Sequence, residues 1–476
     1  MSSLATFDGI IDQSPPFMPA TTTGGAQERG LPIFRDTNTR EPEPFDPWNL
    51  KKEGRINSTV MATLAEKGHG KTTTNIVIAT RLGARRAGTD KMRLTTDDHR
   101  RDDGTPEYED LTKFFGTEQI NLAEYQLNIL DMAMGMKAHQ QLGTLKACLE
   151  YTIGRKLKVP EAEALRYGLK KVRKLFPKDA ELGLLSLALR NLGMGDVVGF
   201  QADIIGSLAQ RHGNSPEFRK LVEEGAPKEK GDAGNDDQMS LFGPSLSKKA
   251  KKPQFGRQTK GLLDAAAELA SMIEELIDGE YGQIFGGQHS LVEAMSQRMV
   301  AFDYSGLSEE AIMLMQTLMW EWKTAALVNK DKRFQFDIEI HDENYTMWQY
   351  PVYARAMHKY LKQIRSYGTF VIMSTHRLAD YRTVGKKSSR EYQLANNMLS
   401  DVGIWLIGKL DRMAAEEAGK RLRLSETEVE QIQGLTKGNW GLKIGSEAIR
   451  WVTVDLTPDE IEISASDGAN DRMAIV

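Results

Sequence analysis

The sequence predicts an α/β fold in which helices cover both faces of a mostly parallel central sheet. Two observations predict it. Apolar runs typical of buried strands occur at residues 56–64, 299–304, 334–340, 369–374 and 402–407, and stretches with helical spacing separate several of them. Strands that alternate with helices are typical of doubly wound parallel sheets, because each parallel crossover needs a long connection.

The first apolar run leads into the sequence A-E-K-G-H-G-K-T, residues 65–72, which matches a phosphate-binding loop with alanine at its first position. A helical run over residues 71–87 follows, as this motif requires. Its glycines allow backbone N–H groups to turn toward phosphate oxygens, and the helix N-terminus adds its positive end. Lys71 is expected to reach the β- and γ-phosphates, and the Thr72 hydroxyl to bind Mg²⁺. The predicted nucleotide-binding residues are Gly68, His69, Gly70, Lys71, Thr72 and Thr73.

A second strand leads into two carboxylates. Residues 336–340 alternate between apolar and acidic side chains, and Asp342 and Glu343 follow. A phosphate loop needs such a partner, with Asp342 to hold Mg²⁺ and Glu343 to orient and deprotonate the attacking water. Because a buried central strand is more uniformly apolar, an edge strand that ends in a solvated acidic turn is the alternative.

A polar turn follows the next predicted strand. Thr375 and His376 lie there, and His376 is a candidate to sense the γ-phosphate; the alternative is that both residues cap the turn. Three arginines near this turn, Arg377, Arg382 and Arg390, are candidates for a finger that reaches the nucleotide of a neighbouring subunit. Arg377 ranks first because it lies nearest the polar end of the strand.

Composition narrows the class of protein. The 476 residues are enough for two or three domains, and 40% hydrophobic residues support a real core. A net charge of −4 indicates no global basic field for nucleic acid. The one cysteine, Cys148, excludes a disulfide framework and a cysteine-based zinc site, and its helical apolar surroundings favour a core position.

No membrane span or signal peptide is predicted. The sequence has no run of 18 apolar residues, and its N-terminus lacks a basic segment followed by an apolar one. We therefore expect a cytoplasmic protein whose contact with a membrane is at most peripheral, at the inner face.

Several shorter stretches occur in a recognisable order along the chain. After the phosphate loop come Glu107-Tyr108, Leu127–Asp131, Gly282–Gly287, Val300–Ser305, Gln363–Gly368 and Leu422–Gly445. With the two acidic residues at 342–343, this ordered set resembles the ATPase half of the large cytoplasmic ATPase of type IV secretion systems. Its relatives are the conjugative-transfer ATPases, within the HerA–FtsK class. The resemblance covers residues 55–446.

The resemblance implies a RecA-like core with an all-helical insertion between the two Walker motifs, and ATP and Mg²⁺ as cofactors. Lys71 and Thr72 would bind phosphate and metal, Asp342 the metal, and Glu343 would be the base. His376 departs from the family, which usually has glutamine at this position.

We expect five segments on this basis. Residues 1–50 form a flexible N-terminal arm, because they are rich in Pro, Thr, Gly and charge. The family's N-terminal domain has no counterpart in them. Residues 51–131 and 285–450 form the ATPase core, and residues 132–284 the helical insertion, with a linker at 225–260. Residues 451–476 form a C-terminal tail.

The function implied is that of an ATP-hydrolysing motor subunit of a conjugation or type IV secretion apparatus. Expected partners are further copies of the chain, in a dimer or hexamer, and membrane-embedded channel subunits. The alternative is a DNA-directed ATPase, a translocase or helicase of a plasmid or phage that acts outside secretion. DNA is then a partner, and Gln238–Phe242 (QMSLF) resembles the short peptide that docks on sliding clamps.

Overall fold

The computed structural model describes residues 30–86, 92–98, 106–124, 127–131, 136–193, 208–225, 259–287, 297–328, 336–342, 344–364, 367–379 and 389–464. The chain divides into two compact units. The first unit comprises Met1–Gln126, Ala133–Lys137 and His289–Val476, and the second comprises Leu127–Met132 and Ala138–Gln288.

The first unit is built on one 11-stranded sheet with the strand order β2-β1-β11-β10-β9-β3-β8-β7-β4-β6-β5. Every pairing from β9 through β3, β8, β7, β4 and β6 to β5 is parallel. The predicted parallel α/β sheet is therefore confirmed. The strands are β1 (Leu31–Asp36), β2 (Pro42–Phe45), β3 (Val60–Leu64), β4 (Met92–Asp98), β5 (Ile120–Asn121), β6 (Met299–Asp303), β7 (Phe336–His341), β8 (Thr369–Thr375), β9 (Ile404–Ile407), β10 (Asn439–Ile444) and β11 (Arg450–Thr453).

The other end of the sheet is antiparallel, which differs from the expected segments at both ends of the core. Residues 31–45 form β1 and β2, and β1 pairs with β11 of the expected C-terminal tail. The arm therefore does not extend to residue 50, and the core continues beyond residue 450. The reason is tertiary: these short strands complete each other's hydrogen bonds and bury apolar side chains such as Phe34 and Phe45.

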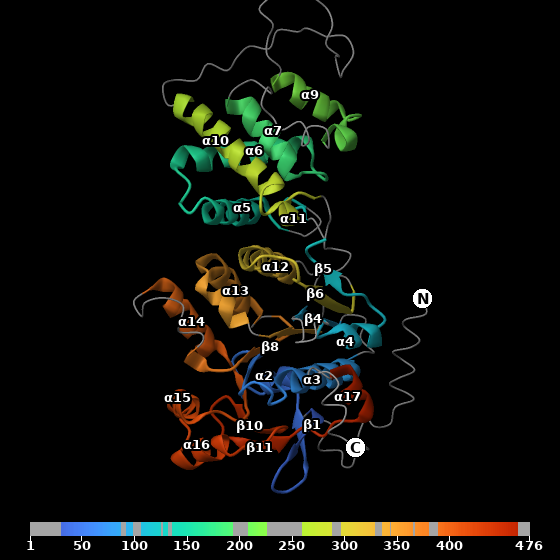
Figure 1. The fold of residues 1–476 in the computed structure, drawn as a ribbon, viewed down its shortest axis with the longest axis vertical. Helices are drawn as coiled ribbons and strands as arrows, with labels where there is room; N and C mark the ends of the chain where they lie inside the picture. The colour runs from blue at the N-terminus through green and yellow to red at the C-terminus, as the bar shows by residue number, and fades with distance from the viewer. Residues whose placement is uncertain are drawn as a thin grey trace, which may run out of the picture. The chain divides into compact units, whose positions relative to one another are not determined.

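Helices cover the two faces of the parallel strands (Figure 1). α3 packs against β3, β4, β7 and β8 on one face. α12 and α13 pack against each other and meet the opposite face of β7. The helices of this unit are α2 (Pro47–Lys52), α3 (Lys71–Arg86), α4 (Glu109–Phe114), α12 (Glu309–Val328), the 3-10 helix η3 (Asn344–Gln349), α13 (Pro351–Ile364), α14 (Arg390–Asp401), α15 (Arg412–Leu422), α16 (Glu426–Gln433) and α17 (Pro458–Ser464).

The acidic strand β7 is central and buried. It lies between β8 and β4, and its residues Asp337 and Glu339 are 4% and 0% exposed. The alternative of a solvated edge strand is therefore wrong. The alternation has a simple physical basis. Ile338 and Ile340 belong to the apolar core that includes α3, whereas Glu339 faces polar partners on α12 and α13.

The second unit is helical, as expected for the insertion. Its helices are α5 (Ala138–Thr152), α6 (Val159–Leu175), α7 (Leu182–Gly193), α9 (Pro216–Gly225), α10 (Thr259–Asp278) and α11 (Gly282–Phe285). α10 packs against α6 and α7, and Cys148 is buried. The expected linker and the QMSLF stretch lie outside the described residues, apart from Gly225 and the start of α10. Among the described helices of the chain, none is both long and apolar enough to span a membrane.

Candidate functional site

The site begins where β3 ends. All five residues of β3 are buried, and residues 65–70 connect it to the first turn of α3 at Lys71. Gly68 and Gly70 have φ angles of +78° and +89°, a region that side chains disfavour. At Gly68 no atom lies within 4 Å of the position that a Cβ would take. This turn leaves open space beside the loop and presents the N-terminus of α3 to it.

The Lys71 amine contacts the backbone at the start of this loop. Its Nζ donates hydrogen bonds to the carbonyl oxygens of Ala65 at 3.1 Å and Glu66 at 3.2 Å. It also lies 2.9 Å from Nδ1 of His376, at the end of β8. An ammonium group can only donate, so Nδ1 of His376 is the acceptor. The structure thus brings together two of the predicted catalytic residues, Lys71 and His376.

A second contact joins Thr72 to Asp342, the two residues predicted to bind Mg²⁺. The Thr72 hydroxyl donates to Oδ2 of Asp342 at 3.1 Å, across a sequence separation of 270 residues. Asp342 is 5% exposed and follows the last residue of β7. The two residues predicted to bind metal therefore lie side by side.

Tyr108 is a third member of this contact, and its role was not predicted from the sequence. It lies just before α4, is fully buried, and its hydroxyl donates to the same Oδ2 of Asp342 at 2.9 Å. The Glu107-Tyr108 pair appeared only as part of the resemblance. A buried tyrosine hydroxyl almost always has a partner, which is the signal that could have suggested a polar contact here.

A buried polar chain ties the loop to the neighbouring strand. The Thr63 hydroxyl donates to Oδ1 of Asn75, and Nδ2 of Asn75 donates to the Ser374 hydroxyl, both at 2.7 Å. These residues belong to β3, α3 and β8. Because a buried amide demands partners, Asn75 holds the two strands and the helix in one arrangement. Asn75 lies on the buried face of α3, four residues after Lys71. A polar residue within this apolar stretch of the sequence could have indicated a buried hydrogen-bonding role.

The His69 side chain lies beneath the loop. Its ring packs edge-on against Trp440 with centroids 4.9 Å apart, and Nε2 lies 3.2 Å from the carbonyl oxygen of Asn439. Burial lowers the pKa of His69, so the ring is neutral near pH 7. The side chain thus braces the loop against β10. Because its ring contacts β10, His69 could contact a nucleotide only through its backbone.

Two further side chains lie near the start of α3 and the loop, those of Thr73 and Lys437. The Thr73 hydroxyl donates to the carbonyl oxygen of Ser464 in α17 at 3.1 Å, which ties α3 to the end of the described chain. Lys437, in the turn before β10, reaches the loop from the other side. Its Cε lies 3.9 Å from the position that a Cβ on Gly70 would take. No motif in the sequence marks this lysine.

The remaining predicted residues are only partly described. Arg377 is an exposed side chain whose guanidinium lies 3.1 Å from Asp411, the N-cap residue of α15. Glu343 and Arg382 lie outside the described residues, as does the side chain of Arg390. The catalytic assignments of these residues stay predictions.

The residues present fit a magnesium-bound triphosphate. A hydroxyl and a carboxylate are the oxygen ligands that Mg²⁺ prefers, and Thr72 and Asp342 present them next to each other. The Lys71 ammonium lies in the same loop, with the free space beside Gly68. The site therefore holds a positive group, two oxygen ligands for a metal and a helix N-terminus, which suit phosphate binding.

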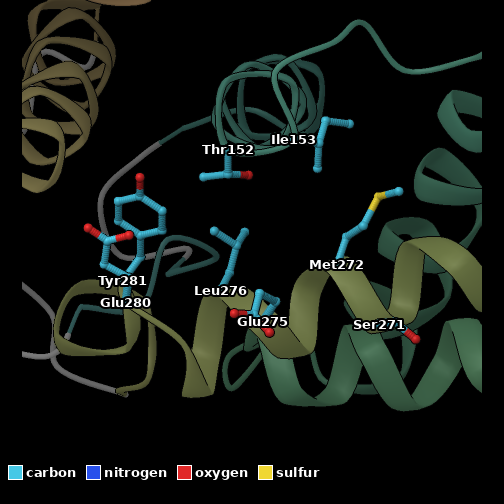
Figure 2. Close-up of a pocket in the computed structure, with 8 residues that line it drawn as sticks. All are labelled: Thr152, Ile153, Ser271, Met272, Glu275, Leu276, Glu280 and Tyr281. Carbon is cyan, nitrogen blue, oxygen red and sulfur yellow. The ribbon is translucent and has the colours of Figure 1, made fainter.

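A separate cavity of about 450 Å³ lies within the second unit (Figure 2). It is lined by the end of α5, by α10 and by Glu280 and Tyr281. In Figure 2 the side chains of Leu276 and Tyr281 point toward it. Its lining includes acidic but no basic residues, so it does not suit a phosphate group.

Comparison with known proteins supports the fold. No protein-family model matches the sequence, and no curated protein matches it. Among solved structures, the chain is similar to VirB4 of Thermoanaerobacter pseudethanolicus, with a TM-score of 0.57 and 16% identity over 90% of this chain and 97% of that one. It is also similar to the plasmid coupling protein TrwB in complex with ADP and Mg²⁺, with a TM-score of 0.43 and 13% identity over 92% of each chain. The likeness to VirB4 confirms the predicted fold class: the chain has a RecA-like phosphate-loop NTPase fold with a helical second unit.

Proposed function

We propose that this chain is an ATP-hydrolysing motor subunit of a conjugative DNA-transfer or type IV secretion apparatus. One observation carries the proposal: the Thr72 hydroxyl meets the Asp342 carboxylate at 3.1 Å, so the two halves of an ATPase site converge at one edge of the sheet, after β3 and β7, with β8 between these strands. The fold shared with VirB4 supports the assignment to secretion, as does the ordered set of stretches described above.

In this proposal, each described residue of the site has one task. The loop N–H groups and the N-terminus of α3 bind the phosphates, and the Lys71 ammonium exchanges its carbonyl partners for β- and γ-phosphate oxygens. Thr72 and Asp342 hold Mg²⁺, which neutralises charge that develops on the phosphates. His376, already in contact with Lys71, lies where it can donate through Nε2 to a phosphate oxygen or a water.

Glu343 is the proposed general base, because it directly follows the metal-binding Asp342 in the sequence. Arg377 is the proposed finger toward a neighbouring copy, because its side chain is 62% exposed although it lies one residue from His376. These assignments imply a dimer or a ring, docked on channel subunits at the inner face of a membrane.

The proposal is tested first by Glu343→Gln. We expect this variant to bind ATP as the wild type does and to lose hydrolysis by about 10²–10⁴-fold, the usual contribution of a general base. Binding of a fluorescent ATP analogue and release of phosphate, both in Mg²⁺, measure the two effects separately. Equal turnover in the variant and the wild type would remove Glu343 from its role.

In the natural host, the same substitution is expected to abolish substrate transfer. Normal transfer, together with ATP hydrolysis that DNA stimulates in the wild type, would favour the DNA-directed ATPase instead.

A second prediction concerns the orientation of Asp342. Tyr108→Phe removes only the hydroxyl that donates to Asp342. Partners that orient a metal ligand typically contribute about 10–100-fold to metal affinity or activity, so we expect the Mg²⁺ concentration for half-maximal turnover to rise within that range. The matched control is Tyr353→Phe, which removes an equally buried hydroxyl that lies 3.1 Å from the sulfur of Met357. If both variants keep the Mg²⁺ requirement of the wild type, Tyr108 does not orient Asp342.

A further inference from the structure

A buried charged cluster lies on the strand that carries Asp342. The Glu339 carboxylate of β7 is fully buried, and the Lys323 ammonium of α12 lies 3.3 Å from its Oε1. The Tyr360 hydroxyl of α13 donates to the same oxygen at 2.6 Å. Nε2 of His341 donates to Oε2 at 3.2 Å. We call Lys323, Glu339, His341 and Tyr360 the β7 network.

Aromatic contacts enclose this network. The Trp320 ring lies 4.6 Å from the His341 ring and 5.0 Å from the Tyr360 ring, and the Lys323 ammonium lies 4.9 Å from its centre. Trp320 and Lys323 are each 2% exposed. The charges are therefore almost inaccessible from the surface, and their described partners are protein groups.

The partners of Glu339 favour its ionised form. Burial alone would raise the pKa of Glu339, but the Lys323 ammonium and the hydrogen bonds from His341 and Tyr360 outweigh it and lower that pKa. Glu339 is therefore ionised near pH 7, and a buried carboxylate of this kind tolerates few arrangements of its partners.

The network discriminates between strand registers. Along β7, residues 338 and 340 point into the apolar core around α3, and residues 339 and 341 point to α12 and α13. A shift by one residue would place the Glu339 charge in that apolar core. A shift by two would bring the shorter Asp337 opposite Lys323 and Tyr360. Backbone hydrogen bonds to β4 and β8 can form in any register, so side chains must select one.

We propose that the β7 network is a positioning network that sets the register of β7 and thereby holds Asp342 against Thr72 and Tyr108. Asp342 directly follows His341, so its place is determined by the register of the strand, although its side chain serves the opposite face of the sheet. The part that concerns Mg²⁺ rests on the proposed function, and the part that concerns the register does not.

The test replaces three members of the network, and keeps His341, without leaving an unpaired carboxylate or ammonium. The triple variant Lys323→Met/Glu339→Leu/Tyr360→Phe replaces the ion pair and the hydroxyl with apolar side chains of similar size. Such replacements of buried ion pairs are often neutral or stabilising. A thermal unfolding midpoint and a far-UV spectrum like those of the wild type establish that it folds.

The readouts separate positioning from stability. Hydrogen–deuterium exchange without nucleotide should be faster in the peptide that contains β7 and unchanged in peptides from β6 and β9. The Mg²⁺ concentration for half-maximal ATP turnover should rise by about 10–100-fold, the effect expected of groups that orient a metal ligand. The affinity for ATP in EDTA should be unchanged, because it depends on the Lys71 loop. The variant Lys323→Met/Glu339→Gln keeps an acceptor for Tyr360 and should recover most of the turnover.

A matched control comes from the second unit. Arg190 and Glu274 form an ion pair whose side chains are 11% and 5% exposed, and Arg190→Met/Glu274→Leu removes it in the same manner. We expect no change in the Mg²⁺ requirement of this variant.

Unaltered hydrogen–deuterium exchange of β7 in a folded triple variant would overturn the inference. A wild type that exchanges as expected but lacks Mg²⁺-dependent turnover would overturn only the proposed function. Faster exchange in the triple variant with an unaltered Mg²⁺ requirement would overturn the link to Asp342.

Discussion

Replacement of Lys71 by alanine is expected to abolish ATP turnover and to weaken ATP binding severely. The Lys71 ammonium sits between the loop carbonyls of Ala65 and Glu66 and the ring of His376. It is 8% exposed, so water screens its charge little, and its attraction for phosphate is correspondingly strong. Loss of one such preorganised group costs about 10²–10³-fold in turnover, and here the loss of binding adds to it.

The measurement is phosphate release at saturating Mg²⁺, with binding of a fluorescent ATP analogue alongside. The control is Lys443→Ala in β10, which removes a lysine that is also 8% exposed and donates to the carbonyl oxygen of Glu447. We expect that control to retain binding and turnover. Detectable turnover in Lys71→Ala above about a tenth of the wild-type rate would contradict the assignment, because it is far more than the loss of such a group allows.

Replacement of Asp342 by asparagine is expected to have the second large effect. The amide keeps the size of the side chain and an oxygen near Thr72 and Tyr108, but it removes the negative charge that attracts Mg²⁺. We expect turnover to fall by about 10²–10³-fold, as for other groups that stabilise charge in a transition state. ATP binding without metal should persist, since the phosphate loop is unchanged.

Titration with Mg²⁺ and with Mn²⁺ at fixed ATP checks this prediction. The matched control is Asp337→Asn, because Asp337 is an equally buried carboxylate at the other end of the same strand. Metal dependence should change in the first variant and not in the second. An identical metal requirement in both would place the metal somewhere other than at Asp342.

Much of the fold could be predicted because its signals are local. Strands β6, β8 and β9 are short apolar runs, and α3 begins at its predicted first residue, Lys71. The pairing of Thr72 with Asp342 could also be predicted, since a phosphate loop requires an acidic partner at the same edge of the sheet.

Other elements have no local signal of this kind. β2 has the sequence Pro-Glu-Pro-Phe, which does not read as a strand because proline cannot donate to a ladder. It is tolerated because β2 lies at the edge of the sheet. Its neighbour β1 pairs with β11, more than 400 residues along the chain, as the bond from Arg35 to Asp455 illustrates. Short strands of this type depend on partners that no sequence window contains.

The sequence by itself determined the class of the fold and the position of the phosphate loop, because periodicity and motif spacing involve only a few consecutive residues. It also indicated that Thr72 and Asp342 would meet, because the chemistry of a phosphate loop requires an acidic partner. Only the tertiary structure decided that Tyr108 supports Asp342, that His69 lies beneath the loop, and that Glu339 is a buried ion rather than an exposed one. The physical reason is that the free energy of a buried polar group depends on its partners, and folding brings those partners from distant elements.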